Sequence, residues 1–269
     1  MDVAPEYVVA RRVLLDALDA LESHVPNLVL VGAQAVYHHA GDADLRVPLF
    51  TTDADLAIDT QGLEDSPEIG DILRAAGFSP GTNPGHWVDA RQVAVDLMVV
   101  PHQSGRTKPS ARAASLPPHD KATARVARGL EPALVDHEIV AMAALEPGDT
   151  RRVDLKVAGP AALLTAKAIK IAERLDHATV QPDRLRAKDA LDAFRIFQAV
   201  ETEVLAQGFA SHATDEHARA VTAEAIEIYR AEASTADGRI AQLAAAAAHG
   251  DRTVAPSFAA LVAELLEEL

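Results

Sequence analysis

The chain of 269 residues contains no cysteine. Disulfide bonds and thiolate metal sites are therefore excluded, and the absence fits a reducing compartment. No apolar run approaches the roughly 20 residues that a membrane-spanning helix needs. The amino-terminal segment mixes charges into an amphipathic pattern and lacks the uninterrupted apolar core of a signal peptide. The sequence therefore predicts a cytoplasmic protein without a membrane partner.

Basic residues are scarce, with 25 Lys and Arg against 40 Asp and Glu, a formal net charge of −15. Phosphate neutralisation by Lys and Arg supplies most non-specific affinity for nucleic acids, so this balance argues against a general nucleic-acid coat protein. Residues 105–129 are an exception, because they hold six basic residues and one acidic residue. This stretch fits a solvated loop and a phosphate-contacting patch equally well.

The first half of the chain mixes helical and strand patterns. Apolar residues recur at helical spacing over residues 5–24, and a short apolar strand is expected at 28–31. Gly32 permits a tight turn into a helix that begins near Ala33. The further expected elements are a strand over 50–59, a helix over 66–76, a hairpin of strands 86–90 and 92–100, and strands between Pro101 and Gly159.

From Pro160 onward the segments are rich in Ala and Leu and repeat with the 3.6-residue period of helices. The sequence thus predicts an α/β fold, of the α+β kind, in which a mixed sheet with flanking helices is followed by an all-helical half. We expect a first domain over residues 1–159 and a helical domain over residues 160–269.

Two carboxylates lie two positions apart on the expected strand 50–59. Side chains alternate faces along a strand, so Asp53 and Asp55 project the same way. Such a pair repels itself unless a cation sits between, and its oxygen ligands suit Mg²⁺ that substrate phosphates also hold. Asp96 stands alone among apolar residues, where a charge is costly to bury unless it is paired or metal-bound. It is a candidate third carboxylate, and the alternative is a strand-end Asp paired with an Arg.

Charges also interrupt the apolar patterns of the helical half. Lys167 shares a helix face with Lys170, and Asp189 and Asp192 lie one turn apart on the next helix. Antiparallel helices joined by a short loop would bring Lys167 and Asp189 to similar heights. Spacing alone does not separate a functional pair from ordinary solvated charges.

Five segments together resemble the nucleotidyltransferase superfamily, and in particular its AbiEii and MenT-type toxins: VGAQAVYHH, TTDADLAID, VDLMVV, PAALLTAKAIK and RAKDALDAF. That family has a turn of small residues, a Thr/Ser-x-Asp-x-Asp strand, and a helical half with a Lys and the Asp of KD-x-x-D. The resemblance covers residues 28–197. The chain departs from it at Ala33, where many relatives carry Ser, and in the longer stretch before Asp53, which an insertion around residues 41–47 would explain.

The resemblance implies a nucleotidyltransferase-like sheet and a role for each matching position. These positions are Gly32, Ala33 and Thr51 for nucleotide binding, Asp53 and Asp55 for catalysis and the metal, and Lys167 and Asp189 for catalysis, with Lys167 also binding the nucleotide. Asp96 or Asp189 would complete the metal site or accept a proton. Lys170 is expected to turn partly away and to matter far less than Lys167.

The implied enzyme is Mg²⁺-dependent and moves a nucleotide from an NTP to an acceptor hydroxyl. By resemblance the acceptor is an RNA, a tRNA end, and the protein is the toxin of a toxin–antitoxin pair with an antitoxin protein as partner. One alternative is a small-molecule enzyme of the aminoglycoside nucleotidyltransferase type, because overall acidity favours cationic acceptors. Another is a catalytically silent member that binds only nucleotide or a partner protein, which Ala33 supports.

Overall fold

A mixed sheet forms the centre of the protein in the computed structural model, which describes residues 3–41, 47–108, 110–177, 180 and 185–269. Its eight strands in this described part run in the order β3-β4-β5-β2-β1-β8-β7, and β6 pairs with β5. The strands are β1 (Leu28–Val31), β2 (Asp53–Ile58), β3 (Ser79–Pro80), β4 (His86–Val88), β5 (Ala94–Val99), β6 (Arg125–Val126), β7 (His137–Ala143) and β8 (Arg152–Ala158).

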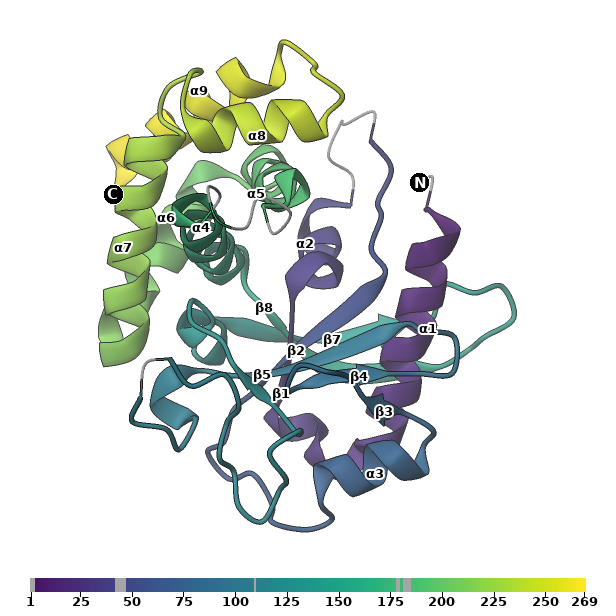
Figure 1. Ribbon diagram of the computed structural model, residues 1–269. Coiled ribbons are helices and arrows are strands. Elements are labelled where there is room, and N and C mark those ends of the chain that lie inside the picture. Colours follow the sequence, from purple (N-terminus) through teal and green to yellow (C-terminus); the bar gives the residue numbers. More distant parts are fainter. Residues whose placement is uncertain (1–2, 42–46, 109, 178–179, 181–184) are drawn as a thin grey trace.

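Helices cover the sheet. They are α1 (Pro5–Ala20), α2 (Gly32–Ala40), α3 (Ile69–Ala75), α4 (Pro160–Asp176), α5 (Ala187–Ala199), α6 (Thr202–Ser211), α7 (Glu216–Glu232), α8 (Arg239–Ala247) and α9 (Val254–Glu268). Figure 1 shows α2 and the helices of the second half above the sheet and α3 below it. Helix α1 packs across β2 and β5 and also contacts α3.

Strand β1 consists of four successive apolar residues, Leu28–Val31, and its central position in the sheet explains this pattern. Strand β1 is buried along its whole length and lies between β2, with which it is antiparallel, and β8, with which it is parallel. Strand β2 continues the sheet by pairing in parallel with β5. Strands covered on both faces need apolar residues at successive positions, as β1 has.

The helical half packs around α4, which contacts α2, α5, α6 and α7. Aromatic rings fill its centre: Phe194 of α5 lies 5.4 Å from Phe258 of α9, measured between ring centroids. The buried Tyr229 hydroxyl of α7 donates to the Leu164 carbonyl of α4 at 2.9 Å. The buried apolar core extends without a break from the sheet into these helices.

The predicted fold class is confirmed: a mixed sheet with flanking helices precedes the helices α4–α9. The boundary between β8 and α4 falls at Gly159, and the division into two domains stays a prediction. The strand that carries Asp53 and Asp55 is shorter than the expected 50–59, since β2 runs from Asp53 to Ile58. Helix α3 begins later than expected, at Ile69, where the Glu68 side chain accepts from the Asp71 backbone N–H.

Two further expectations from the sequence concern an insertion before β2 and membrane-spanning helices. Most of the insertion expected over 41–47 falls on residues 42–46, which lie outside the described residues. Among the helices that the structure describes, none combines the length and the apolar character needed to cross a membrane.

Candidate functional site

Acidic side chains from two neighbouring strands meet on one face of the sheet. Asp53 and Asp55 lie on β2 with the buried Ala54 between them, and Asp96 is the one half-buried residue of the otherwise buried β5. Strands β2 and β5 are parallel, and Asp55 lies opposite Asp96 in their register. Residues opposite each other on paired strands project from the same face. The structure therefore brings the three expected carboxylates together.

Gly32 lies against this carboxylate row because Val31, the last residue of β1, is opposite Asp55. The Gly32 backbone has a φ of +68°, and a Cβ atom added there would stand 2.0 Å from Asp55 Oδ2. A side chain at position 32 would thus be strained and would collide with the carboxylate. The glycine turn makes room for Asp55 at the start of α2, where the first helical amides lie.

A buried network fixes the backbone and side chain of Asp53. The Thr51 hydroxyl donates to Asp53 Oδ1 at 2.7 Å, and the Gln34 amide donates to the Asp53 carbonyl at 3.1 Å. The guanidinium of Arg11 on α1 donates to Gln34 Oε1 at 2.8 Å. Thr51, Gln34 and Arg11 are all buried. The carboxylate at the start of β2 is therefore held from both α1 and α2.

Asp96 has two partners that sequence reasoning missed. His86 lies opposite it on β4, and its Nδ1 atom is 2.6 Å from Asp96 Oδ1. The Arg125 guanidinium of β6 lies 3.6 Å from Asp96 Oδ2. Asp96 thus lies beside Asp55, as expected of a third carboxylate, and it also pairs with an arginine, as the alternative predicted. The hairpin register was the signal that could have placed His86 here.

Asp55 is the electrostatic centre of the row. The pKa of Asp55 is raised to about 6, mainly by burial and also by the negative charges of Asp53 and Asp96, while Lys170 and Arg125 act in the opposite direction. The row is therefore short of positive charge, and a cation bound among the carboxylates would favour their ionised forms. An all-oxygen donor set of this kind fits Mg²⁺.

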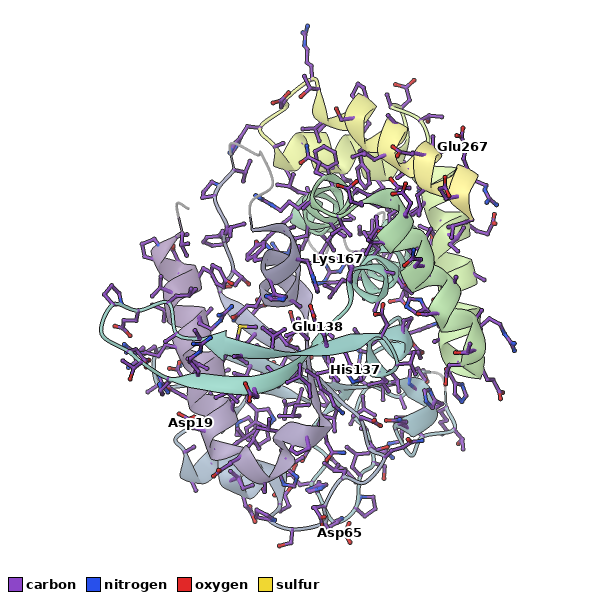
Figure 2. All side chains as sticks on the ribbon, turned by 180° about the vertical axis from the view of Figure 1, so that it is seen from behind. Asp19, Asp65, His137, Glu138, Lys167 and Glu267 are labelled. Carbon is purple, nitrogen blue, oxygen red and sulfur yellow. The ribbon has the colours of Figure 1, made fainter. Side chains whose placement is uncertain are left out.

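Lys167 is enclosed in the helical half, 5% exposed. Its Nζ atom donates to Asp189 Oδ1 at 2.8 Å and to Asp192 Oδ2 at 2.7 Å. Burial lowers the pKa of Lys167, but the charges of the two carboxylates outweigh burial and hold that pKa above its usual value. Figure 2 shows Lys167 among the helices above the sheet. Lys167 and Asp189 are therefore paired with each other. Their similar positions along the neighbouring helices α4 and α5 agree with the prediction from sequence.

More cations than carboxylates gather around this pair. Lys170 donates to Asp189 Oδ1 at 3.1 Å, Arg174 to Asp189 Oδ2 at 2.6 Å, and Lys188 to Asp192 Oδ2 at 3.0 Å. We call the six side chains the ion cluster: Lys167, Lys170, Arg174, Lys188, Asp189 and Asp192. The six side chains themselves comprise four cations and two carboxylates.

The structure places the two lysines of α4 in different surroundings. Lys167 points into the ion cluster, whereas the Lys170 side chain is 43% exposed. Lys170 is also the lysine whose charge lowers the pKa of Asp55. Burial lowers the pKa of Lys170, and the charges of Asp189 and Asp55 act against that effect. Lys170 is therefore the lysine of the ion cluster that acts on the carboxylate row, a place that the sequence had suggested for Lys167.

A comparison with protein families adds to this geometry. The model of a family described as nucleotidyltransferase matches residues 12–218, which is more than half of the chain. The match begins within α1, includes the carboxylate row and the ion cluster, and ends near the start of α7. No curated protein and no solved structure matches the chain significantly.

The raised pKa of Asp55 predicts how stability depends on pH when no metal is bound. The folded protein binds this proton more tightly than the unfolded chain, so the contribution of Asp55 to stability falls as the pH rises from about 4 through 6. We expect Asp55→Asn to raise the free energy of unfolding at pH 7 in EDTA, by on the order of 1–3 kcal/mol, and to change it little at pH 4. Thermal unfolding at both pH values measures this.

The exposed Asp65 supplies the matched control, because Asp65→Asn is expected to leave the melting temperature unchanged at both pH values. A lower melting temperature for Asp55→Asn at pH 7 in EDTA would show that the Asp55 carboxylate is stabilised by partners rather than strained by its neighbours.

The ion cluster predicts different effects for its two lysines. Lys167→Ala leaves two buried carboxylates without their shared cation, so we expect a loss of about 3–5 kcal/mol in the free energy of unfolding. Lys170→Ala removes a half-exposed pair and is expected to cost less than about 1 kcal/mol. It should nevertheless slow nucleotide transfer roughly tenfold or more, equivalent to about 1.4 kcal/mol of transition-state stabilisation. Urea unfolding and turnover measured on the same preparations test both statements.

The exposed Arg252 provides the control substitution, Arg252→Ala, which is expected to change neither quantity. Unchanged turnover in Lys170→Ala, with full stability, would return the phosphate-binding role to Lys167.

Proposed function

The chain belongs to the nucleotidyltransferase family, and we propose that it is a Mg²⁺-dependent enzyme that moves a nucleotide from an NTP to an acceptor hydroxyl. The observation that carries this proposal is the carboxylate row, in which Asp53, Asp55 and Asp96 share one face beside the Gly32 turn. The row is short of positive charge, and nucleotide triphosphates bring Mg²⁺ with them.

The carboxylates have separate tasks in this proposal. Asp53 and Asp55 hold Mg²⁺, and Thr51 keeps Asp53 in position through the hydrogen bond to Oδ1. When bound there, Mg²⁺ neutralises charge on the triphosphate and helps to orient it. Asp96 completes the metal set or accepts the proton of the acceptor hydroxyl. Asp189 is less suited to either task, because three cations already occupy its oxygens.

The triphosphate has two binding elements. The first amides of α2, at Gly32 and Ala33, offer donors to phosphate oxygens, and Ala33 can contribute only its backbone. The exposed Lys170 supplies a mobile positive charge between the ion cluster and Asp55. Lys167 assists from within, by fixing the carboxylates of Asp189 and Asp192 that hold the other cations.

We propose an RNA acceptor, a tRNA end, and a toxin role with an antitoxin partner. The resemblance of five segments to AbiEii and MenT-type toxins supports this, and so does the position of the basic stretch 105–129. Arg125 from that stretch lies on β6 beside β5, 3.6 Å from Asp96, so one positive charge of the stretch lies beside the carboxylate row. The net charge of −15 favours a cationic small molecule at longer range, and this keeps the small-molecule alternative open to the test below.

Nucleotide transfer can be followed with the purified protein, Mg²⁺, each of the four α-labelled NTPs and either total tRNA or aminoglycosides as acceptor. We expect label from at least one NTP in the tRNA fraction, and growth arrest when the protein is expressed. Asp53→Ala and Asp55→Ala should lower transfer by roughly 100-fold or more, since they remove metal ligands. Asp65→Asn should match the unaltered chain.

Label on the aminoglycosides in place of tRNA would support the small-molecule alternative and contradict the toxin role. Absence of label from every NTP and acceptor, with NTP binding retained, would identify a silent nucleotide-binding member.

A further inference from the structure

A second group of potential metal ligands lies away from the carboxylate row. His38 and His39 end α2, and Glu138 lies on the edge strand β7. One ligand atom from each residue can be chosen so that all three atoms lie within 4.8 Å of one another. Since a helix rises about 1.5 Å per residue, the two histidines stand roughly 9 Å along α2 from Gly32. None of the three has a task in the proposed nucleotide transfer.

The spacing of His38 and Glu138 fits two ligands of one ion. His38 Nε2 lies 3.5 Å from Glu138 Oε1. This is long for a charge-assisted hydrogen bond, for which about 2.7–2.9 Å is usual. Two ligands of a tetrahedral Zn²⁺ with bonds of roughly 2.0–2.1 Å lie about 3.4 Å apart. The pair is therefore spaced as metal ligands are.

His39 is prepared to act as a neutral ligand. Its Nε2 atom lies 2.8 Å from the Ala158 carbonyl oxygen, which can only accept, so Nε2 carries the proton. The other ring nitrogen, Nδ1, is left with a free lone pair. A backbone carbonyl that fixes the second nitrogen is the usual outer partner of a metal-bound histidine.

The elements that carry these ligands are fixed relative to one another. Strand β7 pairs with β8 along seven residue pairs, with Glu138 opposite Val157. The carbonyl that holds His39 belongs to the next residue of β8, Ala158. The rings of His38 and His39 contact each other edge to face with centroids 4.9 Å apart. The three side chains thus converge without a rearrangement of the backbone.

We propose that His38, His39 and Glu138 bind a transition-metal ion of the Zn²⁺ type. Two imidazole nitrogens with one carboxylate suit Zn²⁺, Co²⁺ or Ni²⁺, whereas the all-oxygen carboxylate row suits Mg²⁺. Three protein ligands leave a fourth position of a tetrahedral ion open to water or another donor. The ion would tie the end of α2 to the edge strand β7. This inference does not depend on the proposed nucleotide transfer.

Titration calorimetry of the full chain with Zn²⁺, in millimolar Mg²⁺ that keeps the carboxylate row occupied, tests the site. We expect one saturable Zn²⁺ site. His38→Ala, His39→Ala and Glu138→Gln should each weaken it by more than the roughly 10- to 100-fold that loss of an outer partner costs. His38 and Glu138 are 31% and 62% exposed at the side chain, so their variants should fold. Zn²⁺ should also raise the melting temperature of the unaltered chain and not that of His38→Ala.

His137 provides the matched control, because it precedes Glu138 on β7 and its side chain points to the opposite face (Figure 2). His137→Ala should bind Zn²⁺ like the unaltered chain. Co²⁺ in place of Zn²⁺ should give the intense visible absorption of a four-coordinate ion. The proposal is overturned if Zn²⁺ does not saturate a site, if binding survives all three ligand substitutions, or if His137→Ala weakens it equally.

Discussion

Mutual repulsion among three carboxylates on one sheet face is the constraint on which the rest of this structure depends. Asp53, Asp55 and Asp96 are fixed by strand register, so they cannot separate to relieve it. Gly32 has no side chain that could displace Asp55. Hydrogen bonds from Arg11 to Gln34 and from Gln34 to the Asp53 carbonyl hold the start of β2 in place. The fold thus maintains an arrangement that is unfavourable alone and becomes favourable when a cation is bound.

One cluster of side chains in the helical half carries the opposite charge. This ion cluster has two more cations than carboxylates, and Lys170 extends from it toward Asp55. In the proposed function a nucleotide triphosphate with its metal binds between these two groups, because the metal would offset the carboxylates and the phosphates would offset the cations. Lys167 stays buried within the cluster, and its contribution is to hold Asp189 and Asp192 in place. The proposed substrate binding and the pairing of α4 with α5 therefore rest on the same charges.

Local features of the site were predictable from sequence, and relations between distant segments were not. Alternation along a strand is a local rule, so the shared face of Asp53 and Asp55 followed directly. The place of Asp96 beside Asp55 depends on the pairing of β2 with β5, which are not consecutive in the chain. Which lysine of α4 faces the carboxylates depends on how that helix is rotated against the sheet, and helical spacing does not determine rotation. His38 and Glu138 meet only because α2 ends over β7.

The central claim is that the positive charges near Asp55 do not offset the repulsion among the carboxylates until a metal ion binds. The most direct measurement is a pH titration of the Asp55 side-chain carboxyl by ¹³C NMR, with and without Mg²⁺. We predict a pKa of about 6 without metal. In saturating Mg²⁺ we predict a pKa below the ordinary value of about 3.9. A pKa close to the ordinary value in both conditions would contradict the account.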